Sequence, residues 1–221
     1  MTVHHQVRFP NESDGYRSAR NKLLDLEREL RAKVAEVAAV RRQLPAGGEV
    51  PQDYVFATAT GPVPLSRLFQ TGQDTLLLYS LMYKPGGTPC PMCTAFLDSL
   101  NGSARALTQR ISLAVAARAT PAELADLARR RAWTHLRLLS SDGTTYNTDY
   151  NAESASGDQW PILNVFRKDS GSIRHVWASE LFYTTAEAGQ HARHIDQLWP
   201  LWNALDLTPA GRGDNWYPDV S

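Results

Sequence analysis

The sequence is poor in cysteine and has no excess of charge of either sign. Only 2 of its 221 residues are cysteines, and its 23 Lys and Arg residues balance its 23 Asp and Glu residues. A zero net charge argues against a globally basic nucleic-acid-binding protein. No apolar run approaches the ~20 residues of a membrane-spanning helix, and residues 1–10 lack the apolar core of a secretory signal. These absences predict a soluble protein in the cytoplasm.

The two cysteines lie close together, as Cys90 and Cys93 in the sequence Cys-Pro-Met-Cys. In a chain of this length, two randomly placed cysteines would fall three residues apart in only about one case in a hundred. A disulfide that closes so short a loop stabilises a fold little, because it constrains few unfolded conformations. The pair is therefore better explained by chemistry, and two interpretations are open: a redox pair, or two ligands of a metal ion.

Residues 16–44 are predicted to form one long helix, because they contain no Gly or Pro and are rich in helix-forming residues. Apolar residues repeat every seven positions, at Leu23, Leu30, Val37 and Leu44. The Pro-Ala-Gly-Gly sequence at 45–48 ends the helix, so the helical segment is placed at 16–48, after a flexible polar segment at 1–15. Two interpretations are open: a helix lying across the domain, or an arm that forms a coiled coil in a homodimer.

Residues 49–207 are predicted to form an α/β domain. Apolar runs predict strands at residues 54–56, 63–65, 75–83, 111–117 and 136–139, then a hairpin of 162–166 and 173–177. Helices are expected at residues 91–110, with an interruption at Asn101-Gly102, and at 121–131 and 187–205. Strands that alternate with helices indicate a partly parallel sheet with right-handed crossovers. Residues 208–221 are expected to be an irregular tail.

Cys90 is expected just ahead of a helix that begins at Pro91, because proline suits the first helical position. Unpaired N–H groups at a helix N-terminus favour an anion, and only the thiolate form of cysteine is a nucleophile. Cys93 lies one turn further on, where it can reach Cys90 but is more shielded. Cys90 is therefore predicted to attack a disulfide or an oxidised sulfur, and Cys93 to resolve the mixed disulfide.

Other residues are candidates to support this pair. Lys84 is the only nearby cation in the sequence, and it either lowers the pKa of Cys90 or is a solvated loop residue. Tyr146 and Asp149 belong to a long loop, residues 140–159. Long loops without regular structure are often functional. This loop either lines a substrate groove beside Cys90 or forms a turn-rich cover over the sheet.

Two histidines raise the alternative of a metal site. His191 and His194 are three residues apart, a spacing seen among metal ligands, and with Cys90 and Cys93 they would complete a Cys₂His₂ set. Only the fold could bring the two pairs together. No metal site is expected.

A series of short sequences runs in order through the chain: Arg41-Arg42-Gln43-Leu44-Pro45, Asp53-Tyr54-Val55-Phe56, Gly61, Val63-Pro64-Leu65-Ser66-Arg67-Leu68-Phe69, Cys90-Pro91-Met92-Cys93, Trp133, Ser140-Ser141, Tyr146-Asn147-Thr148-Asp149-Tyr150, Pro161-Ile162-Leu163-Asn164-Val165-Phe166 and Leu205-Asp206-Leu207-Thr208-Pro209-Ala210-Gly211-Arg212. This series, over residues 16–212, resembles the thioredoxin-like domain-of-unknown-function family 899. That family lies within the broad alkyl-hydroperoxide-reductase and thioredoxin group. The resemblance implies a thioredoxin-like fold, with a central mixed sheet flanked by helices, and a thiol site. It supplies no substrate.

The resemblance also implies a role for Pro161 and the backbone of Trp160. In thioredoxin-like folds a cis-proline faces the dithiol where a long loop ends and a strand begins, which is the position of Trp160-Pro161. Proline lowers the cost of a cis bond to about 0.5–1 kcal/mol, whereas an ordinary proline at a strand start is trans. We expect Pro161 to be cis, and Pro161 and Trp160 to shape the substrate groove.

The sequence departs from better-known relatives around the pair. Thioredoxins have Trp before the first cysteine and Gly-Pro between the two, whereas here Pro89 precedes a pair that encloses Pro-Met. Peroxiredoxins have Thr three residues before the peroxide-attacking cysteine, but Gly87 occupies that position here. Thr88 is at the wrong spacing and stays a candidate supporting residue. An orthodox peroxiredoxin site is therefore in doubt.

The leading hypothesis is a dithiol–disulfide oxidoreductase, or a thiol-dependent reductase of small oxidised molecules. It needs no cofactor besides its dithiol, and it takes a protein or small-molecule disulfide or a peroxide as substrate, with an external thiol or protein reductant. The alternative is a non-enzymatic thioredoxin-fold scaffold, in which the long helix mediates self-association and the cysteines are idle or metal-bound. Neither hypothesis includes a nucleic acid or a membrane.

Overall fold

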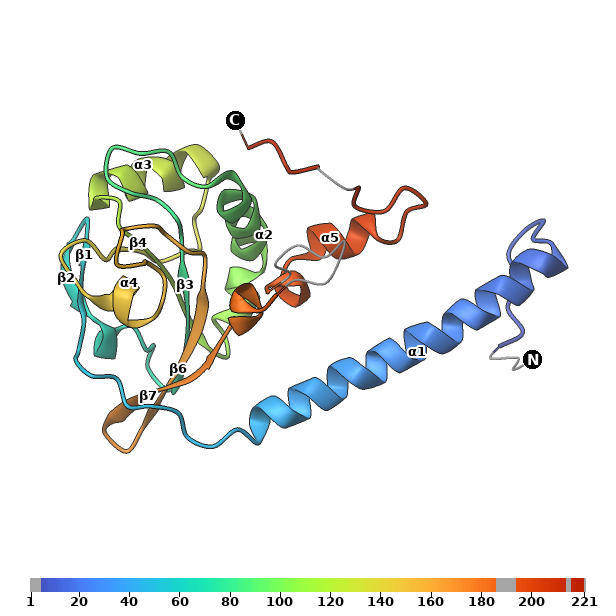
Figure 1. The fold of residues 1–221 in the computed structure, drawn as a ribbon, viewed down its shortest axis with the longest axis horizontal. Helices are drawn as coiled ribbons and strands as arrows, with labels where there is room; N and C mark the ends of the chain where they lie inside the picture. The colour runs from blue at the N-terminus through green and yellow to red at the C-terminus, as the bar shows by residue number, and fades with distance from the viewer. Residues whose placement is uncertain (1–4, 186–193, 214–215, 221) are drawn as a thin grey trace. The chain divides into compact units, whose positions relative to one another are not determined.

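The computed structural model describes residues 5–185, 194–213 and 216–220. It divides into two compact units, Met1–Pro45 and Ala46–Ser221, and the first contains the long helix (Figure 1). Among the described residues, no helix is both long enough and apolar enough to cross a membrane.

The first unit is dominated by α1 (Asp14–Arg42), a single helix of 29 residues. Its start is capped by Ser13, whose hydroxyl accepts a hydrogen bond from the backbone N–H of Tyr16. Its last turn carries Arg41 and Arg42, where positive charge favours the helix dipole. The predicted long helix is thereby confirmed.

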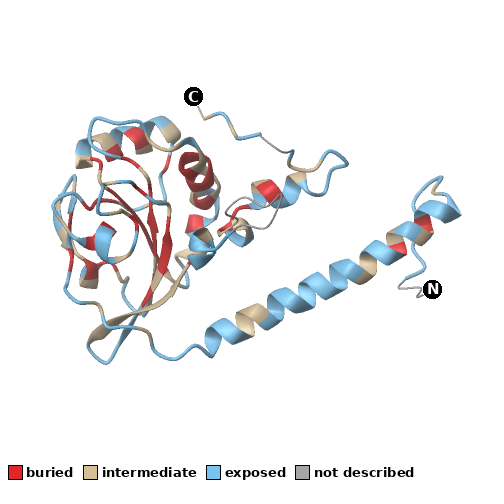
Figure 2. Cartoon of the chain, in the orientation of Figure 1, coloured by how far each residue is buried: buried red, intermediate tan, exposed pale blue. Residues whose placement is uncertain are grey.

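The segment that precedes α1 packs against the beginning of the helix. The carboxylate of Glu12 accepts a hydrogen bond of 2.8 Å from Nε of Arg17 and pairs with its Nη2 as well. Arg17 and Asn21 are buried by this packing. Beyond this point the helix is mostly exposed, as Figure 2 shows.

The described residues of the second unit form a mixed sheet. Its strands are β1 (Val55–Thr58), β2 (Gly61–Pro64), β3 (Thr75–Ser80), β4 (Ser112–Ala117), β5 (Leu138–Ser140), β6 (Leu163–Asp169) and β7 (Ser172–Ala178). Their order in the sheet is β2-β1-β5-β4-β3-β6-β7. The central strands β3, β4 and β5 are parallel, and the outer pairs are antiparallel. The predicted α/β class, a mixed sheet flanked by helices, is confirmed.

The helices of this unit are α2 (Pro91–Leu107), α3 (Pro121–Arg131), α4 (Tyr146–Asp149) and α5 (Pro200–Leu205), with 3-10 turns η1 (Leu65–Arg67), η2 (Glu180–Tyr183) and η3 (Asp196–Leu198). Side chains alternate between the two faces of β3. Tyr79 and Leu81 contribute to a core with residues of α2, α3 and α5. Leu76 and Leu78 contribute to a second core, with residues of η1 and α4. Both faces of the central strands are therefore covered.

Helix α2 runs without a break through Asn101 and Gly102, so the predicted interruption there is wrong. The side chain of Asn101 makes its hydrogen bonds with the backbone outside the helix, at residues 132 and 135, so it does not compete for the backbone groups of α2. It accepts a hydrogen bond of 3.0 Å from the backbone N–H of His135 and donates one to the carbonyl of Ala132. Gly102 fits because an ordinary helical glycine costs only about 1 kcal/mol relative to alanine.

The prediction of one closing helix over residues 187–205 is also wrong for residues 194–205, the part of this range that the structure describes. Residues 186–193 lie outside the described residues, and the rest forms η3 and the short helix α5. Trp199 separates them with an extended conformation, φ −113° and ψ 96°. The residue before a proline is disfavoured in helical geometry, so Pro200 starts a new helix and does not continue the old one.

The segment at residues 46–50 lies along β7. The N–H of His175 donates to the carbonyl of Gly48 at 2.9 Å, and the N–H of Val50 donates to the carbonyl of Ile173 at 2.8 Å. The approach is so close at Gly47 that an added Cβ would lie 1.7 Å from the carbonyl oxygen of His175. Glycine is therefore required at position 47.

Candidate active site

Helix α2 begins at the cysteine pair, close to the C-terminal end of the central strand β3. After β3 the chain forms a loop, and the N–H of Cys90 returns to donate a hydrogen bond of 3.0 Å to the carbonyl of Met82. Cys90 is the N-cap residue of α2, and Pro91 occupies the first helical position. The structure thus places the pair at a helix start, as its sequence spacing predicts.

The two thiols contact each other and differ in exposure. Both are free thiols, Cys90 half-buried and Cys93 buried. The backbone N–H of Cys93 donates to Sγ of Cys90 at 3.4 Å, in the way that a hydroxyl caps other helices. The accessible sulfur is therefore the one that receives the hydrogen bonds of the helix N-terminus.

The same arrangement moves the two thiol pKa values apart. The pKa of Cys90 is lowered to about 6, chiefly because the Cys93 thiol donates a hydrogen bond to it; burial opposes this, and the backbone N–H groups of Cys93 and Met92 add to it. The pKa of Cys93 is raised well above its ordinary value, because its proton is held by Cys90 and because it is buried. Near neutral pH, Cys90 is mainly a thiolate and Cys93 a thiol.

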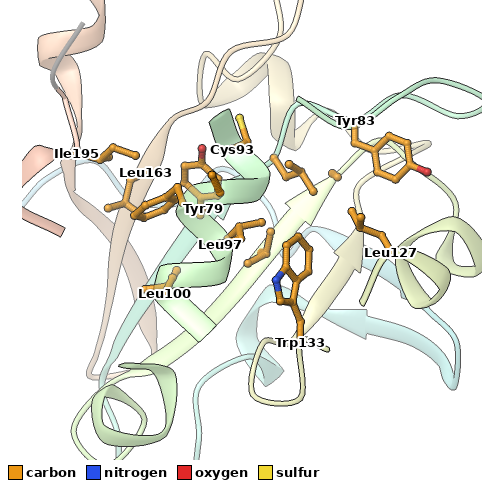
Figure 3. Packing of buried hydrophobic residues seen from close by; sticks show 14 of the residues in the cluster. Tyr79, Tyr83, Cys93, Leu97, Leu100, Leu127, Trp133, Leu163 and Ile195 are labelled. Carbon is orange, nitrogen blue, oxygen red and sulfur yellow. The ribbon is translucent and has the colours of Figure 1, made fainter. Parts of the chain in front are cut away.

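Tyr79, on strand β3, is a further hydrogen-bond partner of the Cys93 thiol. Its ring is buried in the core, and Figure 3 shows it together with Cys93 in this cluster; a hydrogen bond from its hydroxyl acts to lower the pKa of the Cys93 thiol, against the larger effects that raise it. Burial raises the pKa of Tyr79 well above its ordinary value, so the phenol keeps its proton and acts as a donor. Sequence reasoning missed this residue. The available signal was the hydroxyl of Tyr79 directly after three leucines, residues 76–78, in a strand expected to be buried.

Lys84 and Thr88 are exposed residues of the loop that leads to Cys90. The donors that lower the pKa of Cys90 are S–H and backbone N–H groups, so Lys84 is not among them. The backbone carbonyl of Lys84 accepts a hydrogen bond from Gly87 and closes a turn. The loop is also held from α3, because the carboxylate of Glu123 accepts a hydrogen bond of 2.7 Å from the N–H of Gly86.

Pro161 lies near the same end of β3, since Ser80 of that strand donates a hydrogen bond to the next residue, Ile162. Its peptide bond with Trp160 is trans, so the predicted cis-proline is wrong. Trans is the intrinsically favoured isomer of an X–Pro bond. The surrounding chain also holds it: the Trp160 N–H donates to Ala152 at 2.8 Å, and the Ile162 carbonyl accepts from Ser80 at 2.8 Å. Trp160 stays 37% exposed.

Tyr146 and Asp149 are not brought to the cysteines. Tyr146 is fully buried in the core on the other face of the sheet, where its ring meets Phe56 edge-on at 5.2 Å between centroids. Asp149 accepts a hydrogen bond of 2.7 Å from the Tyr54 hydroxyl and one of 2.6 Å from Thr145. Both residues hold α4 against the sheet. The contacts favour the interpretation of residues 140–159 as a cover.

Arg118 also holds this cover, and sequence reasoning missed it. Arg118 follows directly after β4 and pairs with Asp142 at 2.8 Å and with Glu153 at 2.8 Å. One partly buried guanidinium thus ties two points of the loop at 140–159 to the end of a central strand. A guanidinium makes several such hydrogen bonds at once because its donors form a planar fork.

The metal alternative is only partly within the described residues. His191 lies outside them. His194 is half-buried, and this desolvation lowers its pKa to about 4; its Nδ1 lies 2.9 Å from Oγ of Ser179. In the part of the chain that the structure describes, no three His, Cys, Asp or Glu residues are grouped as metal ligands.

Comparisons with known proteins agree with the resemblance seen in the sequence. The model of the family described as "Bacterial protein of unknown function (DUF899)" matches residues 5–220. The chain belongs to this family. No curated protein matches it.

Solved structures with a similar fold share little sequence with this DUF899 member. PrxQ of Xylella fastidiosa has 13% identity and a TM-score of 0.47, covering 61% of this chain and 84% of that one. The peroxidoxin BcpB of Mycobacterium tuberculosis has 19% identity and a TM-score of 0.47, covering 73% and 98%. A secreted Mycobacterium tuberculosis disulfide oxidoreductase homologous to Escherichia coli DsbE has 18% identity and a TM-score of 0.40, covering 67% and 96%.

Proposed function

We propose that the protein is a thiol oxidoreductase that works through Cys90 and Cys93. The observation that carries this proposal is the opposed state of two neighbouring thiols at one helix start. The pKa of Cys90 is lowered to about 6, and that of Cys93 is raised well above its ordinary value. A structural pair of cysteines needs no such separation, whereas a nucleophile and its resolving partner do.

With a disulfide substrate, the Cys90 thiolate attacks one sulfur and forms a mixed disulfide. The other substrate sulfur leaves as a thiolate and takes up a proton. Cys93 then loses its proton and attacks Sγ of Cys90, which releases the second substrate thiol and leaves a Cys90–Cys93 disulfide. Two electrons pass from the protein to the substrate. An external thiol or a protein reductant returns them.

A hydroperoxide can enter the same cycle. The Cys90 thiolate attacks the terminal peroxide oxygen, which breaks the O–O bond and gives a sulfenic acid and an alkoxide, and the alkoxide takes up a proton from water and leaves as an alcohol. Cys93 then displaces water from that sulfenic acid and forms the same disulfide. Gly87 stands where a peroxiredoxin has threonine, so we favour disulfides over peroxides as the main substrates.

Tyr79 stabilises the second thiol whenever Cys93 carries negative charge. This happens as Cys93 attacks Cys90, and again when the reductant opens the internal disulfide. The Tyr79 hydroxyl and the Met82 N–H both donate to Cys93, and a buried anion gains most from such donors. Tyr79 is thus a positioning residue for the resolving step.

The substrate is proposed to bind near the C-terminal end of β3, beside Cys90 and Pro161. Trp160 presents partly exposed aromatic surface there, and its ring is 5.7 Å from that of Phe182. Lys84 and Thr88 are exposed on the neighbouring loop, where they contact a bound substrate and not the thiol itself. A dithiol that turns over with an external reductant fits the reducing cytoplasm.

The test is a redox titration of the pair in glutathione buffers, read by alkylation and intact mass. A reversible two-electron couple of roughly −120 to −270 mV is expected, the range of known oxidoreductases. Cys90→Ser should abolish turnover of a model disulfide, and Cys93→Ser should accumulate mixed disulfides. A pair that never oxidises reversibly, or full activity in Cys90→Ser, rejects the proposal.

A second candidate function is favoured by α1. Leu26 and Leu30 of this helix are 61% and 65% exposed, although both belong to its apolar repeat. A scaffold protein that forms a homodimer through α1 explains this exposure. Self-association through α1 is compatible with the thiol chemistry, and sedimentation of the full chain tests it independently of that chemistry.

A further inference from the structure

The apolar residues of α1 form one stripe along the helix. Between Leu23 and Val40, five of them are 45 to 65% exposed: Leu23, Leu26, Leu30, Val34 and Val40. Single exposed apolar residues are normal on a protein surface, but a contiguous stripe indicates an interaction site. Spacings of three and four residues place them on the same face of the helix, with the half-buried Val37 between Val34 and Val40.

The stripe follows the seven-residue repeat of a coiled coil. With Leu23 at position a, the later a positions are Leu30 and Val37, and the d positions are Leu26, Lys33 and Val40. Lys33 is the polar exception. Its Nζ pairs with Glu36 at 2.7 Å, which draws the ammonium toward the flank of the stripe.

The segment before α1 leaves this stripe free. The helix residues that it buries, Arg17 and Asn21, fall at positions b and f of the same repeat. These positions lie on the side of the helix opposite a and d. At a rise of 1.5 Å per residue, the 29 residues of α1 extend about 44 Å, enough for several layers of packing against another helix.

We propose that α1 binds α1 of a second copy of this chain as a parallel, in-register, two-stranded coiled coil. This inference rests on the second candidate function, self-association, and adds its orientation and register. It does not depend on the thiol chemistry.

The charges that flank the stripe favour the parallel arrangement. In a parallel coiled coil, each g residue faces the e residue five positions later in the partner helix. Lys22 then faces Glu27 of the second copy, and Glu36 faces Arg41 of the second copy. Each pair occurs twice by symmetry. Glu27, which pairs with Arg20 of its own helix at 2.9 Å, gains a second cation.

The antiparallel arrangement is disfavoured by the charged residues at the same two heptad positions, e and g. The antiparallel register that packs Leu23 against Val40 brings e residues opposite e residues and g residues opposite g residues. Arg20 then faces Arg41 of the second copy, and Glu29 faces Glu36 of the second copy. All of these pairs have like charges, which oppose association.

Charge reversal measures the orientation. Glu36→Lys and Arg41→Glu, each made alone in the full chain, should weaken the dimer roughly tenfold in sedimentation equilibrium. The double variant should restore it, because the parallel pair is rebuilt with its charges exchanged. In an antiparallel dimer, Glu36→Lys creates an attraction with Glu29 and strengthens association, so the two orientations predict opposite signs.

Cysteine cross-linking measures the register. In the full chain with Cys90→Ser and Cys93→Ser, the variant Leu23→Cys should form a disulfide-linked dimer under mild oxidation. Ala35→Cys, at position f on the far side of the helix, is the matched control and should not. An antiparallel dimer separates the two copies of residue 23 by about 26 Å at 1.5 Å per residue, and instead cross-links a mixture of Leu23→Cys and Val40→Cys chains.

The outcomes separate the two levels of the proposal. A chain that stays monomeric at all concentrations overturns self-association and orientation together. A dimer that Glu36→Lys strengthens, and that Leu23→Cys does not cross-link, overturns the parallel arrangement and leaves self-association standing. Restoration in the double variant with cross-linking at residue 23 confirms the proposal.

Discussion

Helices α2 and α3 begin in nearly the same way, yet the cap residue of α2 is a thiol and that of α3 is a hydroxyl. Each has a cap residue followed by proline: Cys90 and Pro91 in α2, Thr120 and Pro121 in α3. In each, the cap side chain accepts a hydrogen bond from the backbone N–H three residues later, at 3.4 Å in α2 and 3.3 Å in α3.

The difference lies in which partner carries the negative charge. In α3 the anion is Glu123, whose carboxylate accepts hydrogen bonds of 2.7 Å from both the N–H and the hydroxyl of Thr120. In α2 the anion is the cap residue Cys90 itself, and Cys93 supplies the proton. In the proposed function, this move of the charge from the third helical residue to the half-buried cap residue is what makes the start of α2 reactive.

The largest effect is expected when the start of α2 is made to look like that of α3. Cys90→Thr keeps a capping side chain but removes the nucleophile, so turnover should fall by at least about a thousandfold. The melting temperature should change by no more than about 2 °C, since threonine also caps helices. Turnover and thermal unfolding measure the two effects, and an active Cys90→Thr protein contradicts the comparison.

Removal of the proton donor comes next. Cys93→Ala takes away the main cause of the lowered pKa of Cys90, so that pKa should rise toward the ordinary value of about 8.5. In the native protein, the rate of Cys90 alkylation should reach half of its plateau near pH 6, since the pKa is lowered to about 6. In Cys93→Ala the half-point should move upward, and the rate at pH 7 should fall by about tenfold.

Met92 and Pro91 provide the control, because Cys93→Ala leaves both in place. If the half-point stays near pH 6 in Cys93→Ala, the helix N-terminus alone lowers the pKa of Cys90. The contrast between the two helix starts would then reside in the cap residue and not in the third helical residue.

Tyr79→Phe is expected to have a smaller and more selective effect. It removes a hydrogen bond to Cys93 but keeps the ring, so the mixed disulfide at Cys90 should persist about tenfold longer, the value of one hydrogen bond to a charged group. Intact mass after a pulse of substrate measures this lifetime. The rate at which Cys90 is alkylated should be unchanged, because the attacking thiol is not altered.

Tyr83→Phe is the matched control for Tyr79→Phe. Tyr83 is also buried in this core, but its hydroxyl points away from Cys93 (Figure 3). Equal effects of the two substitutions would mean that packing, and not the hydroxyl at position 79, controls resolution.

The smallest effect is expected at the start of α3. Thr120→Ala removes a helix cap and should lower the free energy of unfolding by about 1 kcal/mol. Thermal or urea unfolding measures this change. The pKa of Cys90 should stay near 6, because Glu123 still accepts the hydrogen bond from Gly86. A large shift of that pKa would show that the two helix starts are coupled.

Local signals explain what the sequence predicted well. Proline after Cys90 and Thr120 marks two helix starts through short-range geometry, and the repeat from Leu23 onward marks α1. Each of these features depends on residues within a few positions of one another. Sequence reasoning therefore located the pair of cysteines on its helix without knowledge of the sheet.

Contacts between distant residues explain what it did not predict. Tyr79 reaches Cys93 only because β3 lies beneath α2, and Tyr146 is a core residue only because α4 packs on Phe56. The residues on both sides of Pro161 are held by long-range hydrogen bonds, in which Trp160 donates to the carbonyl of Ala152 and Ser80 donates to the carbonyl of Ile162. A periodic pattern indicates that a residue is buried, but not which partner it meets.

The short pairing of residues 48–50 with β7 has a consequence for aggregation. An open sheet has two outer strands whose unpaired backbone groups can recruit strands from other molecules. Here β7 is partly covered by its own chain, through the hydrogen bonds of Gly48 and Val50. The opposite edge, β2, is only four residues long and contains Pro62 and Pro64, which have no N–H to offer. Both outer strands of the sheet are thus poor templates for a strand of another molecule, which lowers the tendency of this protein to aggregate through its sheet.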